Sequence, residues 1–216
     1  MFKRDSVQLL ASVLAAVALV VLMGLVAALA PNALEAMRGP APTPTVGGLV
    51  VDKDTPARDF TLTDQNGQPL KLSDLRGRAV LLFFGYTHCP DICPLSMGEF
   101  KTVKKALGDR AEDVAFVMIS LDPARDTPEV LKRYVEAFDP AFIGLTGDEN
   151  AVRSASADYG VQYEQQKPPG TAATYLIAHT AFSYLLDQEG RWRRTYPFQT
   201  PAEMVARDIV RILDGR

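Results

Sequence analysis

Both cysteines of this 216-residue chain lie in one short segment, residues 85–94, which also contains one of its two histidines. The apolar run 79–85 predicts a buried strand before this segment, and apolar residues at helical spacing from Met97 to Leu107 predict a helix after it. The two thiols are therefore expected at a strand-to-helix turn, where the positive end of the helix dipole lowers a thiol pKa and favours the thiolate. Thiolates attack disulfides and bind metals, so the segment predicts either redox chemistry or a metal site.

Cys89 and Cys93 form a C-x-x-x-C pair, and residues four apart in a helical turn lie on one side with Cβ atoms about 5–6 Å apart. Both sulfurs can then reach one metal ion or each other. A structural disulfide across so short a loop would contribute on the order of 2 kcal/mol, which a domain of this size does not need. A redox dithiol of this kind usually has two residues between its cysteines, so the third residue favours a metal site while leaving the redox alternative open.

A metal site needs further donors, and the sequence offers His88, His179 and methionines that form no Met-rich motif. Because His88 adjoins Cys89, its side chain is expected to point away, as a surface or hydrogen-bonded loop histidine. His179 lies between the apolar runs 175–178 and 181–186, where a lone histidine is most often structural. In a thioredoxin-type sheet, however, the loop before the terminal hairpin passes beside the dithiol turn, which makes His179 the expected third ligand.

Two thiolates and one imidazole suit copper better than other metals. Cu(I) favours thiolate sites of low coordination number, and two sulfurs with one nitrogen and a weak extra ligand suit Cu(II). Zinc more often takes a fourth protein ligand in a closed site. Binding of cobalt or nickel in vitro stays open.

A second polar segment, residues 121–128, follows the apolar run 114–120 at the same edge of the expected sheet as the cysteine turn. Asp122, Arg125 and Asp126 are candidates for a layer outside the ligands, with a carboxylate or guanidinium that orients His179 or meets a partner. The alternative is that this segment only caps the helix expected from Thr127.

The order of the elements that must position these groups predicts an α/β, thioredoxin-like fold with a central mixed sheet flanked by helices. The expected strands are 59–63, 70–72, 79–85, 114–120, 142–145 and 191–196, with the Asn66-Gly67 turn joining the first two. The expected helices end near 107, 138, 159 and 213, and residues 162–171 are expected to form a loop.

Prolines mark the expected helix starts. Pro94 is expected as the first residue of its helix, with Cys93 as the cap, and Pro128 follows the Thr127 cap. Residues 200–203, Thr-Pro-Ala-Glu, predict a capping box for the last helix.

The N-terminal part of the chain predicts a membrane anchor. Residues 7–30 are almost entirely apolar, and residues 6–34 contain no charged side chain. About 20 such residues are enough to span a bilayer. Lys3 and Arg4 place the N-terminus in the cytoplasm. The alternative is a signal peptide cleaved after Ala30, although the apolar run is long for one and Pro31 hinders cleavage.

We therefore predict three parts: a cytoplasmic stub and transmembrane anchor at 1–38, a Pro/Gly-rich linker at 39–54, and a globular domain at 55–216. The domain is expected on the periplasmic side of the cytoplasmic membrane. That space is oxidising, so Cys89 and Cys93 are expected as a disulfide there unless a reductant acts on them. The net charge of −3 provides no basic stripe, which argues against a nucleic-acid partner.

Three blocks of the sequence resemble the signature of the SCO/SenC family, and the resemblance extends from about residue 55 to the C-terminus. The blocks are residues 85–94 (GYTHCPDICP), 120–128 (SLDPARDTP) and 179–187 (HTAFSYLLD). The resemblance implies a thioredoxin-like, membrane-anchored copper protein that helps to assemble the binuclear copper centre (CuA) of cytochrome c oxidase. It also implies that the copper ligands are Cys89, Cys93 and His179.

The partners implied by the resemblance are the CuA-bearing subunit of the oxidase and other copper chaperones. As a metallochaperone the protein would bind and transfer copper rather than act as an enzyme. The alternatives are a thiol–disulfide oxidoreductase that reduces the CuA-site cysteines with Cys89 and Cys93 but without His179, and a copper or redox sensor.

Overall fold

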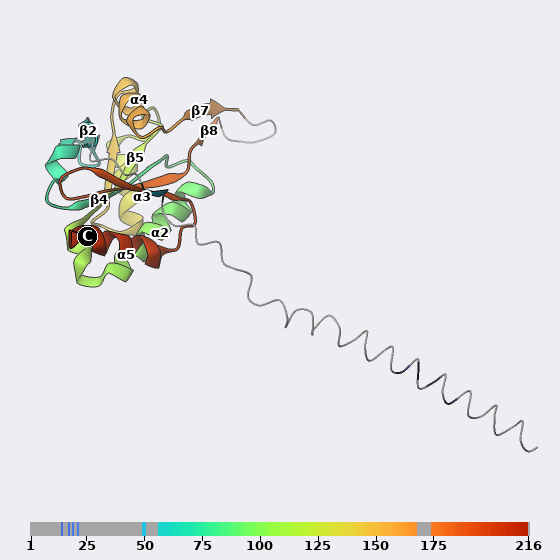
Figure 1. The fold of residues 1–216 in the computed structure, drawn as a ribbon. Coiled ribbons are helices and arrows are strands. Elements are labelled where there is room, and N and C mark those ends of the chain that lie inside the picture. The colour runs from blue at the N-terminus through green and yellow to red at the C-terminus, as the bar shows by residue number, and fades with distance from the viewer. Residues whose placement is uncertain are drawn as a thin grey trace, which may run out of the picture. The chain divides into compact units, whose positions relative to one another are not determined.

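The computed structural model describes residues 56–167 and 174–215, together with 49–50 and the single positions 14, 17, 19 and 21 (Figure 1). The chain divides into two compact units, Met1–Thr45 and Val46–Arg216. The domain boundaries predicted near residues 38 and 54 fall outside the described residues.

Little of the predicted anchor is described. Leu14, Val17, Leu19 and Val21 are helical and their side chains are exposed. Within the part of the chain that the structure describes, no helix has the length and apolar character needed to cross a membrane. The transmembrane anchor therefore stays a prediction.

The second unit is built on an eight-stranded mixed sheet with the strand order β1-β10-β9-β4-β5-β6-β2-β3. Its two central strands, β4 and β5, pair in parallel, and all of their residues are buried. The strands of this sheet are β1 (Leu49–Val50), β2 (Thr61–Asp64), β3 (Pro69–Lys71), β4 (Ala79–Gly85), β5 (Val114–Ser120), β6 (Ile143–Thr146), β9 (Phe182–Leu186) and β10 (Trp192–Pro197). A separate antiparallel pair consists of β7 (Tyr163–Gln166) and β8 (Leu176–His179).

Helices cover both faces of the sheet. They are α2 (Ile92–Leu107), α3 (Pro128–Phe138), α4 (Glu149–Asp158) and α5 (Ala202–Leu213), with 3₁₀ turns η1 (Leu72–Leu75) and η2 (Gly108–Asp113). Neighbouring residues of β4 show the two faces, because successive strand side chains point in opposite directions. The ring of Phe83 meets Phe100 of α2, whereas the ring of Phe84 meets Tyr159 just after α4. Figure 1 shows α2, α3 and α5 on one side of the sheet and α4 on the other.

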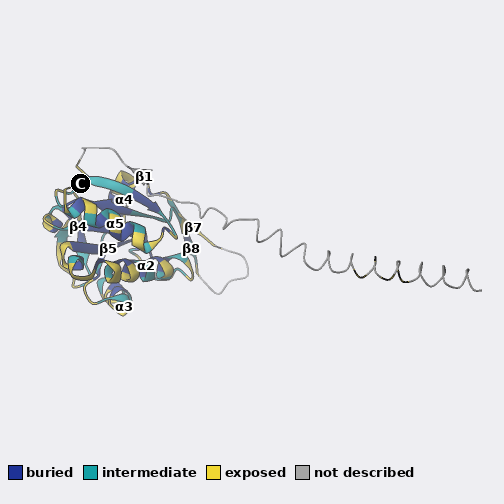
Figure 2. Ribbon diagram, turned by 60° about the horizontal axis from the view of Figure 1, so that its bottom comes forward, coloured by how far each residue is buried: buried dark blue, intermediate teal, exposed yellow. Residues whose placement is uncertain are grey.

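The core lies between these layers. In Figure 2 the central strands are dark blue, and the helices carry yellow, exposed positions on their outer faces. Continuous apolar strands of this kind are typical of parallel pairs buried on both faces. The predicted α/β arrangement with a mixed central sheet is confirmed. The hairpin at Asn66-Gly67, the helix cap at Thr127 and the helix predicted to end near 159, which is α4, are confirmed with it.

Three local predictions were wrong. Helix α2 begins at Ile92 with Asp91 as its cap, so Cys93 and Pro94 lie inside the first turn, where proline removes no helical hydrogen bond. Helix α5 begins at Ala202 with Pro201 as its cap, because the Thr200 hydroxyl donates to the Pro197 carbonyl instead of accepting from the helix.

The third error is in the segment 162–171, which was expected to be a loop. Its first part forms β7, whose last three residues are exposed and polar. This strand is held by pairing with β8 rather than by burial, so it carries no alternating apolar pattern.

Candidate metal centre

The two cysteines lie on the first turn of α2 and just before it, at the carboxyl end of β4. Cys93 is fully buried and Cys89 is partly exposed, and both thiols are free. The backbone N–H of Cys93 points at Sγ of Cys89 at 3.5 Å. The backbone of Gly85 lies close to Cys93. A Cβ atom added to Gly85 would lie 2.4 Å from Cε1 of Phe83 and 3.1 Å from Sγ of Cys93. Glycine thus leaves the space that the buried sulfur occupies.

His179, the last residue of β8, brings its imidazole to the same place. Its Nε2 atom lies 3.5 Å from Sγ of Cys93, and its Nδ1 atom lies 3.0 Å from the carbonyl oxygen of Thr180. A carbonyl only accepts, so Nδ1 carries the proton and Nε2 presents its lone pair to the sulfur. The imidazole is fixed between the rings of Phe83 and Tyr86, each with its centroid 6.1 Å away.

The two thiols differ in acidity. A hydrogen bond from the Cys93 thiol, supported by the backbone N–H groups of Asp91 and Cys93, lowers the pKa of Cys89 to about 5 against the opposing effect of burial. The same hydrogen bond, together with burial, raises the pKa of Cys93. Burial lowers the pKa of His179, so its imidazole is neutral at pH 7. At neutral pH the site holds one thiolate, one thiol and one neutral imidazole.

This donor set fits a soft metal ion. Nε2 of His179 lies at Sγ of Cys93, and Sγ of Cys89 lies at the backbone N–H of Cys93. A metal held by these groups at neutral pH would displace the proton of Cys93. Thiolate and imidazole are donors that copper accepts readily, whereas magnesium and calcium prefer oxygen. The structure places Cys89 and His179 each against Cys93, but the three donor atoms do not all lie within 4.8 Å of one another, so the three-ligand set stays a prediction.

Asp126 ties the cysteine turn to the end of β5. Its buried carboxylate accepts hydrogen bonds from the backbone N–H of Thr87 at 2.9 Å, from the Thr87 hydroxyl at 2.6 Å and from the Ser120 hydroxyl at 2.6 Å. Charged acceptors make strong hydrogen bonds in buried surroundings. Asp126 therefore positions the segment that carries Cys89, and its contacts are with that segment rather than with His179.

Asp122 and Arg125 pair with each other and with a residue that the sequence analysis did not single out, Tyr175. The carboxylate of Asp122 accepts from Nε of Arg125 and, at 2.7 Å, from the hydroxyl of Tyr175. Neither residue makes a hydrogen bond to His179, whose Nδ1 partner is the Thr180 carbonyl. Tyr175 carried no sequence signal, because it lies in an apolar run 53 residues from its partner.

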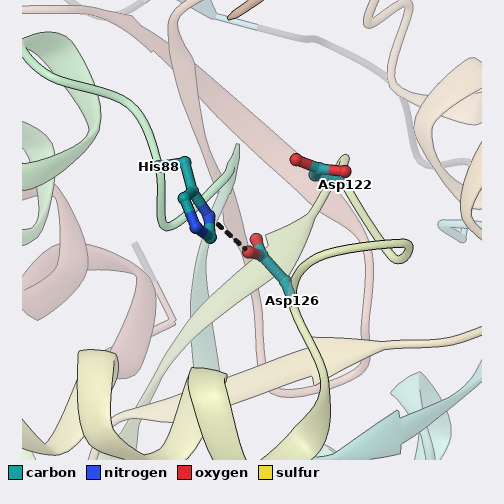
Figure 3. A group of neighbouring side chains, drawn as sticks. All are labelled: His88, Asp122 and Asp126. Atoms are coloured by element: carbon teal, nitrogen blue, oxygen red, sulfur yellow. Dashed lines mark ion pairs between the residues drawn. The ribbon is translucent and has the colours of Figure 1, made fainter. Parts of the chain in front are cut away.

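His88 has the environment expected of a loop histidine. Its side chain is 49% exposed, with Nδ1 at 3.0 Å from the Thr87 hydroxyl and at 3.5 Å from the Asp126 carboxylate. Figure 3 shows it beside Asp126 and Asp122, and one ligand atom from each of the three lies within 4.8 Å of the others. The carboxylate oxygens already accept hydrogen bonds from protein donors, so this group is better explained as hydrogen-bonded structure than as a second metal site.

Comparison with known proteins identifies a family and relatives to which this chain is similar. The profile of the SCO1/SenC family matches residues 51–214. The SCO2-like protein RP587 of Rickettsia prowazekii is 38% identical over 146 residues, which cover 68% of this chain and 71% of that protein.

Two solved structures are similar to this chain in fold. Bradyrhizobium japonicum ScoI, solved with copper bound, is 39% identical with a TM-score of 0.67, and the match covers 74% of this chain and all of that one. BsSco, described as a member of the Sco family of cytochrome c oxidase assembly proteins with a disulfide switch, shares the fold at 23% identity. Its TM-score is 0.59, and the match covers 78% of this chain and 97% of that one.

Proposed function

This chain belongs to the SCO1/SenC family, and from that premise we propose that it is a copper metallochaperone. It binds copper through Cys89, Cys93 and His179 and delivers it to the CuA centre of cytochrome c oxidase during assembly. Residues 1–38 anchor it in the cytoplasmic membrane, with the copper-binding domain on the periplasmic side. Copper, as Cu(I) or Cu(II), is its cargo, and the CuA-bearing subunit is its partner.

The observation that carries this proposal is the approach of Nε2 of His179 to Sγ of Cys93 at 3.5 Å, with the lone pair of the nitrogen directed at the sulfur. A dithiol used only for redox chemistry has no need of a third donor in this position. The hydrogen bond to the Thr180 carbonyl fixes the tautomer that binds a metal, which is the usual arrangement of ligating histidines.

The difference in exposure between the two cysteines supports transfer. Cys93 and His179 hold the inner side of the site, whereas Cys89 is partly exposed and can be reached by a thiol of the partner. A partner thiolate that binds the copper on this side displaces Cys89 first, and the remaining ligands follow by stepwise exchange. The ion then never leaves protein ligands.

A second function, thiol–disulfide exchange, is favoured by the unequal acidity of the cysteines. Cys89, with its pKa of about 5, attacks one sulfur of a partner disulfide, and the other partner sulfur leaves as a thiolate. Cys93 then loses its proton and attacks Sγ of Cys89, which frees the second partner thiol. The partner gains two electrons and Cys89 and Cys93 become a disulfide. A sensor of copper or of redox state would use the same residues.

The test is copper binding to the reduced full-length protein in detergent, against a chelator of known affinity. We expect one copper per chain, and we expect His179→Ala to weaken binding by at least the roughly 10–100-fold seen when a ligand's supporting partner is lost. His88→Ala is the matched control and should bind as the wild type does. Unchanged affinity in His179→Ala would remove His179 from the site and favour the oxidoreductase.

A further inference from the structure

The strand that carries His179 is not part of the main sheet. β8 pairs with β7 in a separate two-stranded hairpin, with Tyr163 opposite His179 and Gln166 opposite Leu176. Figure 1 shows the two strands side by side, beyond the strands of the main sheet. At its carboxyl end β8 runs on through Thr180 towards β9. A two-stranded hairpin is only marginally stable alone, so its amino-terminal end needs other attachments.

One attachment is made by Tyr86 from the cysteine turn. Its hydroxyl accepts the backbone N–H of Ile177 at 3.1 Å, in the middle of β8. Its ring also packs edge-on against the imidazole of His179. This contact joins the cysteine turn to the hairpin directly.

The other attachment is a closed ring of contacts among Asp122, Arg125 and Tyr175, which we call the clasp. The guanidinium of Arg125 lies over the Tyr175 ring, 3.6 Å from its centroid, and donates from Nη1 to the Tyr175 carbonyl at 3.2 Å. Asp122 completes the ring by accepting from both the guanidinium and the Tyr175 hydroxyl. Tyr175 immediately precedes β8, so the clasp holds the chain just before the first residue of the strand.

Asp122 and Arg125 of the clasp are themselves held in place by burial and hydrogen bonds. Asp122 is 1% exposed, and its backbone N–H donates to the Ser120 hydroxyl at the end of β5. Its carbonyl accepts the backbone N–H groups of Arg125 and Asp126, which fold the loop into a tight turn. The Arg125 side chain is only 21% exposed, so the charge pair is sheltered from solvent.

On the β7 side the hairpin is less closely packed. A cavity of about 450 Å³ lies among the loop residues from Leu121 to Ala124, the residues of β7 and the first turns of α4. Packing of β7 against the loop is therefore incomplete. Because fewer packing contacts hold β7 there, side-chain contacts such as the clasp contribute more to holding the hairpin than they would in a close-packed core.

We propose that Arg125 and Tyr175 are positioning residues for His179. By fixing the start of β8 to the loop after β5, they hold the imidazole at Sγ of Cys93 without touching it or the metal. This inference rests on the proposed function and adds how the third ligand is kept in place. It also explains why an arginine serves here, since one planar guanidinium stacks on a ring while it donates to a carboxylate and a carbonyl.

The test is a double-mutant cycle on the full-length protein in detergent, with Cu(I) and a competing chelator as the probe. Arg125→Lys keeps the charge that neutralises Asp122 but loses the stacking and the fork of donors. We expect it to weaken Cu(I) binding about 10-fold, as for other residues that support a ligand. In the His179→Ala background the same change should alter affinity by less than about twofold, because no imidazole remains to be positioned.

Two further variants sharpen the cycle. Tyr175→Phe keeps the stacked ring and removes only the hydroxyl, so its loss of affinity should be smaller than that of Arg125→Lys. Arg193→Lys is the matched control, since Arg193 pairs with the buried carboxylate of Asp187 away from the site, and it should leave Cu(I) affinity unchanged. Equal losses from Arg125→Lys with and without His179, or no loss at all, would overturn the proposal.

A metal-free measurement separates this inference from the proposed function. Amide hydrogen exchange of the reduced, copper-free protein should become faster at Ile177, Ala178 and His179 in Arg125→Lys, and stay unchanged in β4. Unchanged exchange in β8 would overturn the clasp whether or not copper binds. If the wild type bound no copper, the proposed function would fail, and the exchange data would still decide whether Arg125 holds the strand.

Discussion

The cysteine turn between β4 and α2 is attached to the centre of the main sheet, whereas the β7–β8 hairpin that carries His179 is attached mainly through side chains. The turn follows a strand whose residues are all buried, and Asp126 ties it to the neighbouring strand with three hydrogen bonds. The hairpin is held by Tyr86, by the clasp, by its connection to β9 and by Ile177, whose side chain is buried in the core. Two of the proposed ligands thus belong to the core of the domain and the third to a separate hairpin.

Because of this difference, a mutation can weaken metal binding without an equal loss in the free energy of unfolding. Changes at the cysteine turn should affect both, because the turn is continuous with the core. Changes at the hairpin should affect metal binding more than the free energy of unfolding, because elements at the edge of a domain open at low cost in free energy.

The largest effect is expected from Asp126→Ala. It leaves three donors, two on partly buried Thr87 and one on buried Ser120, without their charged acceptor, and a buried unsatisfied group typically costs about 1–3 kcal/mol. We expect a loss of at least about 3 kcal/mol in the free energy of unfolding, measured in urea, together with weaker copper binding. A stable variant with weak copper binding would contradict the idea that the turn and the core form one unit.

An intermediate effect is expected from pH. Near neutral pH the pKa of Cys93 is raised and Cys93 is protonated, whereas Cys89, with its pKa of about 5, and the neutral His179 carry no proton that must leave. Copper affinity should therefore fall about 10-fold per unit as the pH is lowered from about 8 to about 6, because binding releases one proton. Chelator competition across this range provides the slope.

Below pH 5 the slope should steepen, since Cys89 then binds a second proton. A slope corresponding to two protons throughout the neutral range would show that Cys89 is not a thiolate in the free protein. His179 should contribute only below the ordinary histidine pKa of about 6.5, because burial lowers its pKa.

The smallest effect on stability is expected from Tyr175→Phe. It removes one hydrogen bond at the periphery, and Asp122 keeps its pairing with Arg125. We expect the free energy of unfolding to fall by about 1 kcal/mol or less in urea titrations. A loss as large as that of Asp126→Ala would mean that the hairpin is part of the core, and the comparison of the two regions would fail.

The sequence analysis predicted the first region better than the second. The buried strand, the thiols and the helix are contiguous from Ala79 to Leu107, so periodicity and composition describe them together. His179 became a candidate ligand through the expected fold and the family resemblance. Strand β7 was missed because its exposed residues are polar and their pattern contains no information about pairing with β8.

Contacts between polar side chains that are far apart in the sequence could not be predicted from the sequence either. Arg125 and Tyr175 are separated by 50 residues, and their contact depends on the geometry of two elements that no local pattern relates. The errors at Pro94 and Thr200 have a local cause, because a helix can begin at several neighbouring residues and side-chain hydrogen bonds decide among them. Asp122, Arg125 and Asp126 were candidates from the sequence, but their contacts needed the structure: Asp126 bonds to the cysteine turn, and Asp122 and Arg125 bond to Tyr175.

Gly85 has a consequence for tolerance to natural variation. Any side chain there would begin 2.4 Å from the ring of Phe83 and 3.1 Å from the sulfur of Cys93. A residue without a side chain thus sets the space available to the Cys93 sulfur and to the Phe83 ring that packs on His179. Among inherited variants of such a chain, a change at this glycine belongs with changes of the proposed metal ligands, although glycine has no side chain that could bind a metal.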